Sequence, residues 1–325
     1  MSAPLPAPMV PLTVTRLRIT YAVVHPLRLP AYRGPSIRAA LIDALRDRFC
    51  VLHGEVEPRA CGQEPACQVC GIVAPNDAAN TRGSDAARPF ALLPPLDNHT
   101  SLSCADTLAF DLTLFGTAVR YIPYLVLALS GITRMGLGHN AEGGRQLVLQ
   151  EIWAVNDFTG EAHRVHGIRQ PQIVLPHVPV TAQQITAFAA AMSHKIVMLR
   201  LHTPLRLVSD GALVHRLTFP VLIRRILGRL ADLSHAYGNA PFDMDFAPLL
   251  AAADHIKVTQ DETRWQDTAS PSSRLQRSTP IGGLIGSIGF AGDLAPFLPW
   301  LIWGELVQIG KDTTKGNGVF RIASP

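Results

Sequence analysis

Residues 17–34 read LRITYAVVHPLRLPAYRG, and residues 196–211, much later in the chain, read IVMLRLHTPLRLVSDG. Both stretches begin with the alternation of a half-buried strand and continue into Pro-Leu-Arg-Leu. A second pair, YIPYL at 121–125 and FLPWL at 297–301, is separated by almost the same number of residues. Two echoes at one spacing indicate that a structural unit is duplicated.

Each copy is expected to contain the same order of elements. An alternating strand comes first, followed by a helix that Ser36 caps in one copy and Thr218 in the other. Further strands, a second helix opened by a proline-containing segment, and a glycine loop leading into a last strand complete each copy. This β-α-β-β-α-β order predicts an α+β fold of two tandem ferredoxin-like (RRM-like) domains. The expected strands are 12–24, 107–115, 147–152, 195–202 and 281–290, and the expected second helices are 118–130 and 294–308.

The chain has enough residues and enough apolar content for two such domains. It contains 325 residues, of which 47% are hydrophobic. We place the boundary near residues 180–194, so that an N-terminal domain with a cysteine-containing insertion spans 1–192. A C-terminal domain with a glycine-rich loop then spans 193–325.

The charge balance permits a polyanionic partner without requiring one. The formal net charge is +4 and the pI is about 8.9. Residues 1–194 contain arginine but no lysine. Arginine suits bidentate phosphate contacts, although a GC-rich genome produces the same bias. No apolar stretch is long enough to cross a membrane and no secretory leader is evident, so we expect a cytoplasmic protein.

With this order established, the chain resembles the CRISPR-associated endoribonucleases that process precursor CRISPR RNA, within the repeat-associated mysterious protein superfamily. The resemblance covers nearly the whole chain. It rests on the following stretches: PSIRAALIDALRDRFC (35–50), RPFALLPPLD (88–97), LTLFGTAVRYIPYLVLALSGITRMGLG (112–138), SSRLQRSTPIGGLIGSIGFAGDLAPFLPWL (272–301) and GKDTTKGNG (310–318).

The resemblance implies RNA cleavage without a metal. The 2′-hydroxyl beside the scissile phosphate attacks, leaving a 2′,3′-cyclic phosphate and a 5′-hydroxyl. A base, a cationic group and an acid are needed, and the resemblance places them near the first helix. We expect His53, Tyr32 and Arg38 to carry the reaction, with His25 and His139 in reserve. A solvated loop histidine, a packing tyrosine and a surface arginine are the alternative interpretations.

RNA contacts are expected in the second half, where basic residues, hydroxyls and glycines gather. The basic groups suit phosphates, and backbone N–H groups of a glycine loop can lie against them. Alternatively, the charges are only solvated and the glycines only turn the chain into its last strand. The expected RNA-binding residues are Arg264, Ser273, Arg274, Arg277, Lys311, Lys315, Gly316 and Gly318.

Four cysteines cluster after the first helix: Cys50, Cys61, Cys67 and Cys70. Four thiolates with a terminal C-x-x-C are compatible with a structural tetrahedral zinc. The polar stretch that follows departs from the pattern of relatives with cysteines here, so reduced, unliganded thiols are the alternative. No cofactor is expected for catalysis.

Two functions fit these features. The first is an endoribonuclease that cuts CRISPR repeat RNA and retains the mature product. The second is a non-catalytic subunit that binds CRISPR RNA within an effector complex. Other subunits of such a complex are expected partners in both cases. A convincing acid–base pair would separate the two functions, and the sequence leaves that pair ambiguous.

Overall fold

The structure forms two compact units. One runs from Thr15 to Pro179 and is called the N-terminal unit. The other, the C-terminal unit, combines the segment up to Val14 with the chain from Val180 onward. No helix within the described ranges is long and apolar enough to cross a membrane. The computed structural model describes residues 9–52, 61, 67–75, 86–97, 99–133, 135, 145–192, 195–272 and 277–323.

The N-terminal unit contains a five-stranded sheet in the order β3-β5-β1-β6-β7. The first four strands of this order reproduce the antiparallel ferredoxin-like sheet, and β7 extends it beyond β6. The expected fold of this half is therefore confirmed. The strands are β1 (Val14–Val23), β3 (Phe90–Leu93), β5 (Thr107–Phe115), β6 (Leu147–Asn156) and β7 (Glu161–Gly167). A two-stranded sheet joins β2 (Leu27–Arg28) to β4 (Ser101–Leu102).

Helices cover the apolar face of this sheet. α1 (Gly34–Phe49) packs against α3 (Ile122–Gly131), and α3 contacts β6. A 3₁₀ turn, η2 (Gly116–Tyr121), precedes α3, and the short α2 (Gln68–Val73) packs on α1. The Tyr21 hydroxyl donates a hydrogen bond of 2.7 Å to the Leu129 carbonyl, which ties β1 to the end of α3.

The predicted cap of the first helix is wrong. α1 begins at Gly34, two residues before Ser36, and Arg33 occupies the N-cap position. Proline at position 35 is already in the first turn, where its missing N–H costs nothing. Ser36 therefore lies inside the helix, and no side chain makes a capping bond there.

The C-terminal unit repeats the topology. Its main sheet has the order β11-β15-β8-β16, and β12 also pairs with β15. The strands are β8 (Ile196–Leu205), β11 (Lys257–Asp261), β12 (Arg264–Gln266), β15 (Gly283–Ala291) and β16 (Phe320–Ala323). Two small hairpins join β9 (Val208–Ser209) to β10 (Ala212–Leu213), and β13 (Ala269–Ser272) to β14 (Arg277–Pro280).

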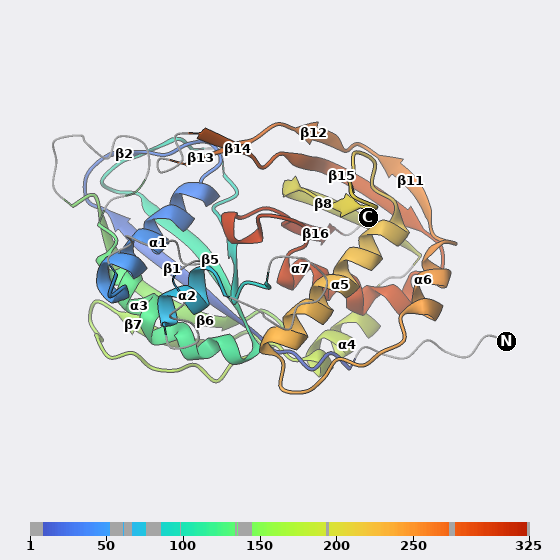
Figure 1. Ribbon diagram of the computed structural model, residues 1–325, viewed down its shortest axis with the longest axis horizontal. Helices are drawn as coiled ribbons and strands as arrows, with labels where there is room; N and C mark the ends of the chain where they lie inside the picture. The colour runs from blue at the N-terminus through green and yellow to red at the C-terminus, as the bar shows by residue number, and fades with distance from the viewer. Residues whose placement is uncertain are drawn as a thin grey trace. The chain divides into compact units, whose positions relative to one another are not determined.

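Two helices form the core of this unit. α5 (Phe219–Tyr237) packs against α7 (Leu298–Val307), and α7 lies against β16 (Figure 1). Phe219 contacts Phe290 and Phe297 edge-on, with ring centroids 5.0 Å apart in both pairs. Thr218 occupies the N-cap of α5 as expected, but its side chain makes no capping bond. The remaining helical segments are α4 (Ala182–Ala190), α6 (Ala247–Ala253), η3 (Ala295–Phe297) and η4 (Thr313–Lys315).

The start of the described chain belongs to the C-terminal unit. Val14 and Val180 exchange two backbone hydrogen bonds of 3.0 and 2.8 Å, and the Asn239 N–H donates to the Pro11 carbonyl. α4 also belongs here, because it packs against α7. The compact unit thus begins at Val180, upstream of residue 193, where the sequence pattern places the second domain.

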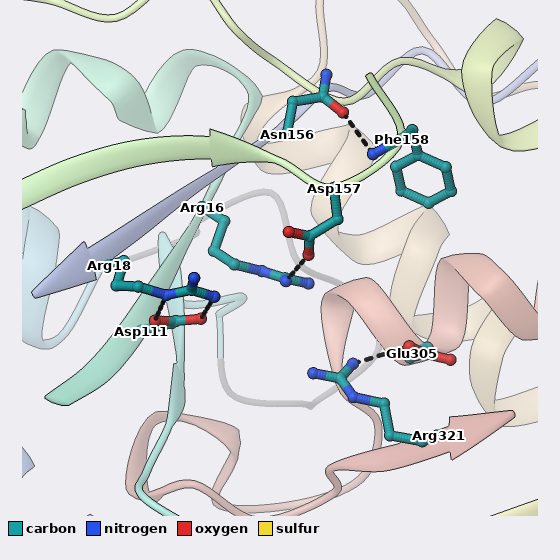
Figure 2. Close-up of polar contacts among 8 residues, drawn as sticks. All are labelled: Arg16, Arg18, Asp111, Asn156, Asp157, Phe158, Glu305 and Arg321. Carbon is teal, nitrogen blue, oxygen red and sulfur yellow. Dashed lines mark hydrogen bonds and ion pairs between the residues drawn. The ribbon is translucent and has the colours of Figure 1, made fainter. Parts of the chain in front are cut away.

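The last strand is held by a charged contact with α7. The Arg321 guanidinium donates to Glu305 at 2.9 Å (Figure 2), and the other Glu305 oxygen accepts the Ile322 N–H at 3.1 Å. Glu305 thus satisfies a backbone donor of the β16 strand while pairing with a side chain of the same strand.

Candidate functional site

A buried polar cluster in the N-terminal unit lies at the start of α1. Arg33 is almost completely buried, at 2% side-chain exposure. Its guanidinium donates to both carboxylate oxygens of Asp97, at 2.5 and 3.3 Å, and also to the His99 carbonyl. A buried cation requires such partners. Arg33 therefore fixes the segment that carries Asp97 and His99 beside the first helix.

His99 is the exposed member of this cluster, at 79% side-chain exposure. Its Nδ1 lies 3.5 Å from Asp97 Oδ1, and its backbone N–H donates to the same oxygen at 3.0 Å. Burial opposes ionisation of Asp97, but the Arg33 guanidinium and the His99 N–H more than compensate, so the pKa of Asp97 lies below its ordinary value. Asp97 therefore remains a carboxylate that can orient the imidazole.

These residues line a cavity of about 380 Å³. Asp106 lies on another part of its wall, where hydrogen bonds from the Ser103 N–H and hydroxyl lower the pKa of the Asp106 carboxyl. Arg28 is exposed and lies opposite Ser101 in the β2–β4 pair, and Ser101 is next in sequence to Leu102 of the cavity wall. The arrangement combines an accessible imidazole with an oriented carboxylate, a pair that can transfer protons to and from a substrate. The described residues lining the cavity are Arg33, Pro95, Asp97, His99, Leu102, Asp106, Thr107, Leu108 and Ala109.

The residues expected to be catalytic are only partly located. Tyr32 is half-buried directly before Arg33, and Arg38 is half-buried in the early part of α1. Neither is among the described residues that line the cavity. His53 and the reserve His139 lie outside the described residues, and His25 is exposed after β1. Their roles stay predictions.

Sequence reasoning missed Arg33, Asp97 and His99. Asp97 is the last residue of the stretch RPFALLPPLD, one of the motifs that carry the family resemblance. The signal that could have found the cluster is a histidine two residues after an aspartate, following an apolar run. No local pattern, however, links these residues to Arg33, 64 positions earlier.

The glycine loop between α7 and β16 is folded inward. Gly316 and Gly318 are buried, with left-handed φ of +89° and +78°. The Gly316 N–H donates to the Thr313 carbonyl and the Gly318 N–H to the Pro204 carbonyl. These two amides are therefore hydrogen-bonded inside the protein, and a contact between these glycines and RNA stays a prediction.

The charged side chains of this loop differ in their surroundings. Lys315 pairs with Asp312 at 2.9 Å, whereas Lys311 is exposed. Arg264 is also exposed, on β12. Arg277 begins β14, and Ser273 and Arg274 lie outside the described residues. Lys311 and Arg264 are thus the predicted RNA contacts whose side chains are described and reach solvent.

Three of the four clustered cysteines are neighbours. Burial, followed by hydrogen bonds with Cys67 and Cys61, raises the pKa of the Cys70 thiol to about 12. Cys67 is at the N-cap of α2 and Cys50 at the C-cap of α1. No three histidine, cysteine or carboxylate side chains in the described part of the chain are arranged to hold a metal ion. Zinc binding by these cysteines therefore stays a prediction.

Two family models match the chain, one in each half. The first, AF_1859_N, an N-terminal domain, matches residues 12–177, which is just over half of the chain. The second is described as CRISPR-associated endoribonuclease Cas6 and matches residues 199–320. The C-terminal half is thus similar to the Cas6 endoribonucleases, and in this sense the chain is Cas6-like.

Solved Cas6 structures share the fold of this Cas6-like chain. A product complex of Cas6 from Thermus thermophilus gives a TM-score of 0.56 at 13% identity, covering 96% of this chain and 99% of that one. Chains from a Cas6-RT-Cas1–Cas2 complex and from a partial form of it each give 0.57 at 14% identity over 96% of this chain. This chain spans only 29% and 46% of those two longer chains. At such identities the likeness establishes the fold, and no curated protein sequence matches the chain.

Proposed function

We propose that this Cas6-like chain is an endoribonuclease that cleaves precursor CRISPR RNA within its repeats and keeps hold of the mature product. The observation that carries the proposal is the Arg33–Asp97–His99 cluster, because it offers an oriented imidazole beside a cavity. The match of the C-terminal half to a Cas6 endoribonuclease model supports the same activity. Precursor CRISPR RNA is made in the cytoplasm, which is where we place the protein.

The proposed reaction needs no metal ion. The 2′-oxygen attacks the adjacent phosphorus, the bond from phosphorus to the 5′-oxygen breaks, and a 2′,3′-cyclic phosphate and a 5′-hydroxyl result. His99 accepts the 2′-hydroxyl proton, with Asp97 orienting its ring and stabilising the imidazolium that forms. Arg28 and Arg38 stabilise the charge that develops on the phosphate. Tyr32 and His53 are the candidates for returning a proton to the 5′-oxygen.

A cleavage assay in excess EDTA tests this proposal. The substrate is a synthetic CRISPR repeat RNA, and the protein is present at concentrations above the dissociation constant. We expect one cut per repeat, with a cyclic phosphate on the upstream fragment and a 5′-hydroxyl on the downstream fragment. Tight binding without cleavage would instead identify a non-catalytic CRISPR-RNA-binding subunit. Copurification with RNA fragments ending in a cyclic phosphate would support product retention.

We also propose a structural zinc ion and protein partners. The zinc ion is held by Cys61, Cys67 and Cys70, with Cys50 as the fourth ligand. The hydrogen bonds of the Cys70 thiol with Cys67 and Cys61 support this site. Metal analysis of the purified protein and of a Cys70→Ser variant tests it, and zinc retained at equal stoichiometry in both would contradict it. The protein partners are other CRISPR proteins, supported by the Cas6-RT-Cas1–Cas2 chains that share this fold.

A further inference from the structure

One row of side chains crosses three strands of the N-terminal sheet. Trp153 on β6 is paired with Arg18 on β1 and with Arg164 on β7. Residues directly opposite each other in a sheet point to the same face, so these three side chains share one face. The other face of β1 carries fully buried residues such as Leu17 and Ile19, which face the core. The row Arg18–Trp153–Arg164 is therefore on the face of the sheet turned away from that core.

The row is pre-arranged and reaches solvent. The Arg164 guanidinium lies 4.8 Å from the centroid of the Trp153 ring, and one of its nitrogens is 3.9 Å from Glu151. Arg18 is held by both oxygens of Asp111, at 3.3 and 3.4 Å (Figure 2). The Arg18 and Arg164 side chains are 49% and 41% exposed, and Trp153 is partly exposed. Both guanidinium groups are therefore accessible to a ligand at the sheet surface.

This combination has a specific chemical use. An aromatic ring on the open face of a four-stranded RRM-like sheet stacks unpaired bases, and arginine adds a planar cation that stacks or contacts phosphate. A cation–π pair alone would account for Arg164 over Trp153. Arg18, held by Asp111, adds a second guanidinium on the other neighbouring strand, so that Trp153 has an arginine on each side in the same row.

We propose that Trp153 stacks against one unpaired nucleobase of bound RNA, while Arg18 and Arg164 contact the phosphates beside it. The proposal rests on the proposed function for its ligand class, single-stranded RNA. It adds a base-stacking site in the N-terminal unit, apart from the cavity beside α1.

Binding measurements on substituted proteins test the site. The probe is a fluorescein-labelled repeat RNA carrying 2′-deoxyribose throughout the segment that the wild-type protein cuts, so that cleavage does not interfere. Trp153→Ala should raise the dissociation constant about fivefold to a hundredfold, the range for losing one stacked base. Trp153→Phe should retain most of the affinity. The matched controls are Trp265→Phe, at another partly exposed tryptophan, and Arg169→Ala, an exposed arginine after β7 to compare with Arg164→Ala.

Abasic substitutions identify the contact as a base contact. One abasic position should weaken binding to the wild-type protein and leave binding to Trp153→Ala unchanged, whereas the other positions should weaken both proteins equally. The same RNA should quench tryptophan fluorescence of the wild type more than that of Trp153→Phe, which keeps an aromatic ring at this position. This second readout holds even where the alanine variant folds poorly.

The outcomes separate the two proposals. Wild-type cleavage together with unchanged binding by Trp153→Ala, or equal abasic losses at every position in both proteins, overturns the stacking site alone. An absence of RNA binding by the wild-type protein overturns the proposed function and the stacking site together.

Discussion

The buried guanidinium of Arg33 determines the position of His99. Arg33 is removed from water and is held by Asp97 and by the His99 carbonyl, so the chain near residue 99 is fixed through charge rather than through apolar packing. The imidazole itself stays in solvent next to a carboxylate that keeps its charge. A proton acceptor that is accessible yet oriented is what transfer from a substrate hydroxyl requires.

The first prediction concerns this imidazole. His99→Ala should lower the single-turnover cleavage rate at least about tenfold, because general acid–base groups typically contribute more than that. The dissociation constant for uncleaved RNA should stay close to that of the wild type. His163→Ala, at an exposed histidine of β7, is the matched control and should cleave normally. Full activity of His99→Ala would return attention to Tyr32, Arg38 and His53.

The second prediction separates backbone strain from steric collision at glycine. Gly318 has a φ of +78°, and a Cβ there would collide with the Ile309 carbonyl. Gly160 has a φ of +73°, with nothing within 4 Å of the same added atom. Gly160→Ala should therefore show only the left-handed strain of about 1–2 kcal/mol, whereas Gly318→Ala should be clearly less stable in thermal or denaturant unfolding. Equal losses of stability in the two variants would mean that the backbone around Gly318 shifts to accommodate the added Cβ without a further loss of stability.

At the scale of elements, the periodicity of apolar residues predicted the positions of the strands. The expected strand 107–115 coincides with β5, and the expected strands 12–24 and 195–202 match β1 and β8 within a few residues. Those segments alternate because one face of each packs on helices. α4 carries a Thr181 capping box, but this helix was not predicted, because its short apolar pattern looked like linker sequence.

The site was harder to predict than the elements for a physical reason. The cluster at α1 depends on a contact between Arg33 and Asp97, and sequence periodicity carries no information about such distant pairs. The glycine loop was located correctly between the second helix and the last strand. The N–H groups of Gly316 and Gly318, however, donate to the Thr313 and Pro204 carbonyls inside the fold. Glycine marks a backbone that must take an unusual conformation, whether the neighbour is a ligand or the protein itself.

The third prediction concerns the two lysines of that loop. Lys311→Ala should reduce the slope of log affinity against log salt concentration by about 0.7, the value for one lost phosphate contact on single-stranded RNA. Lys315→Ala should change the slope less, because Asp312 already pairs with Lys315. Affinity measured from low to moderate salt checks both variants. The same slope in the wild type and in Lys311→Ala would show that Lys311 makes no phosphate contact.

At the scale of the whole molecule, the chain enters the C-terminal unit twice. Val10, Leu12 and Val14 are buried, and backbone bonds join this segment to Val180 and Asn239. The N-terminal unit, Thr15 to Pro179, is thus inserted between two parts of the other unit. A domain boundary drawn only once along the sequence leaves out the first of these parts.

The fourth prediction follows from this insertion. Removing the chain up to Thr13 should destabilise the C-terminal unit, because burial of one valine or leucine side chain contributes about 1.5–3 kcal/mol. Hydrogen exchange should accelerate at the Asn239 amide, which loses its Pro11 acceptor. The Ile19 and Ile152 amides, in the β1–β6 pair of the N-terminal unit, serve as the internal reference. Unchanged protection at Asn239 would contradict the assignment of this segment to the C-terminal unit.

The same discontinuity bears on how the protein is made. On the ribosome, Pro11 and Val14 leave the exit tunnel before any of Thr15 to Pro179, and their partners Asn239 and Val180 follow only after all of it. The inserted unit has its own sheet and helices and can fold as soon as it has been translated. During this time the apolar side chains of Val10 and Leu12 stay exposed on the nascent chain, because the part of the C-terminal unit that buries them has not yet been made. Vectorial synthesis thus lets this segment dock only after the inserted unit and the partner residues beyond it have been made.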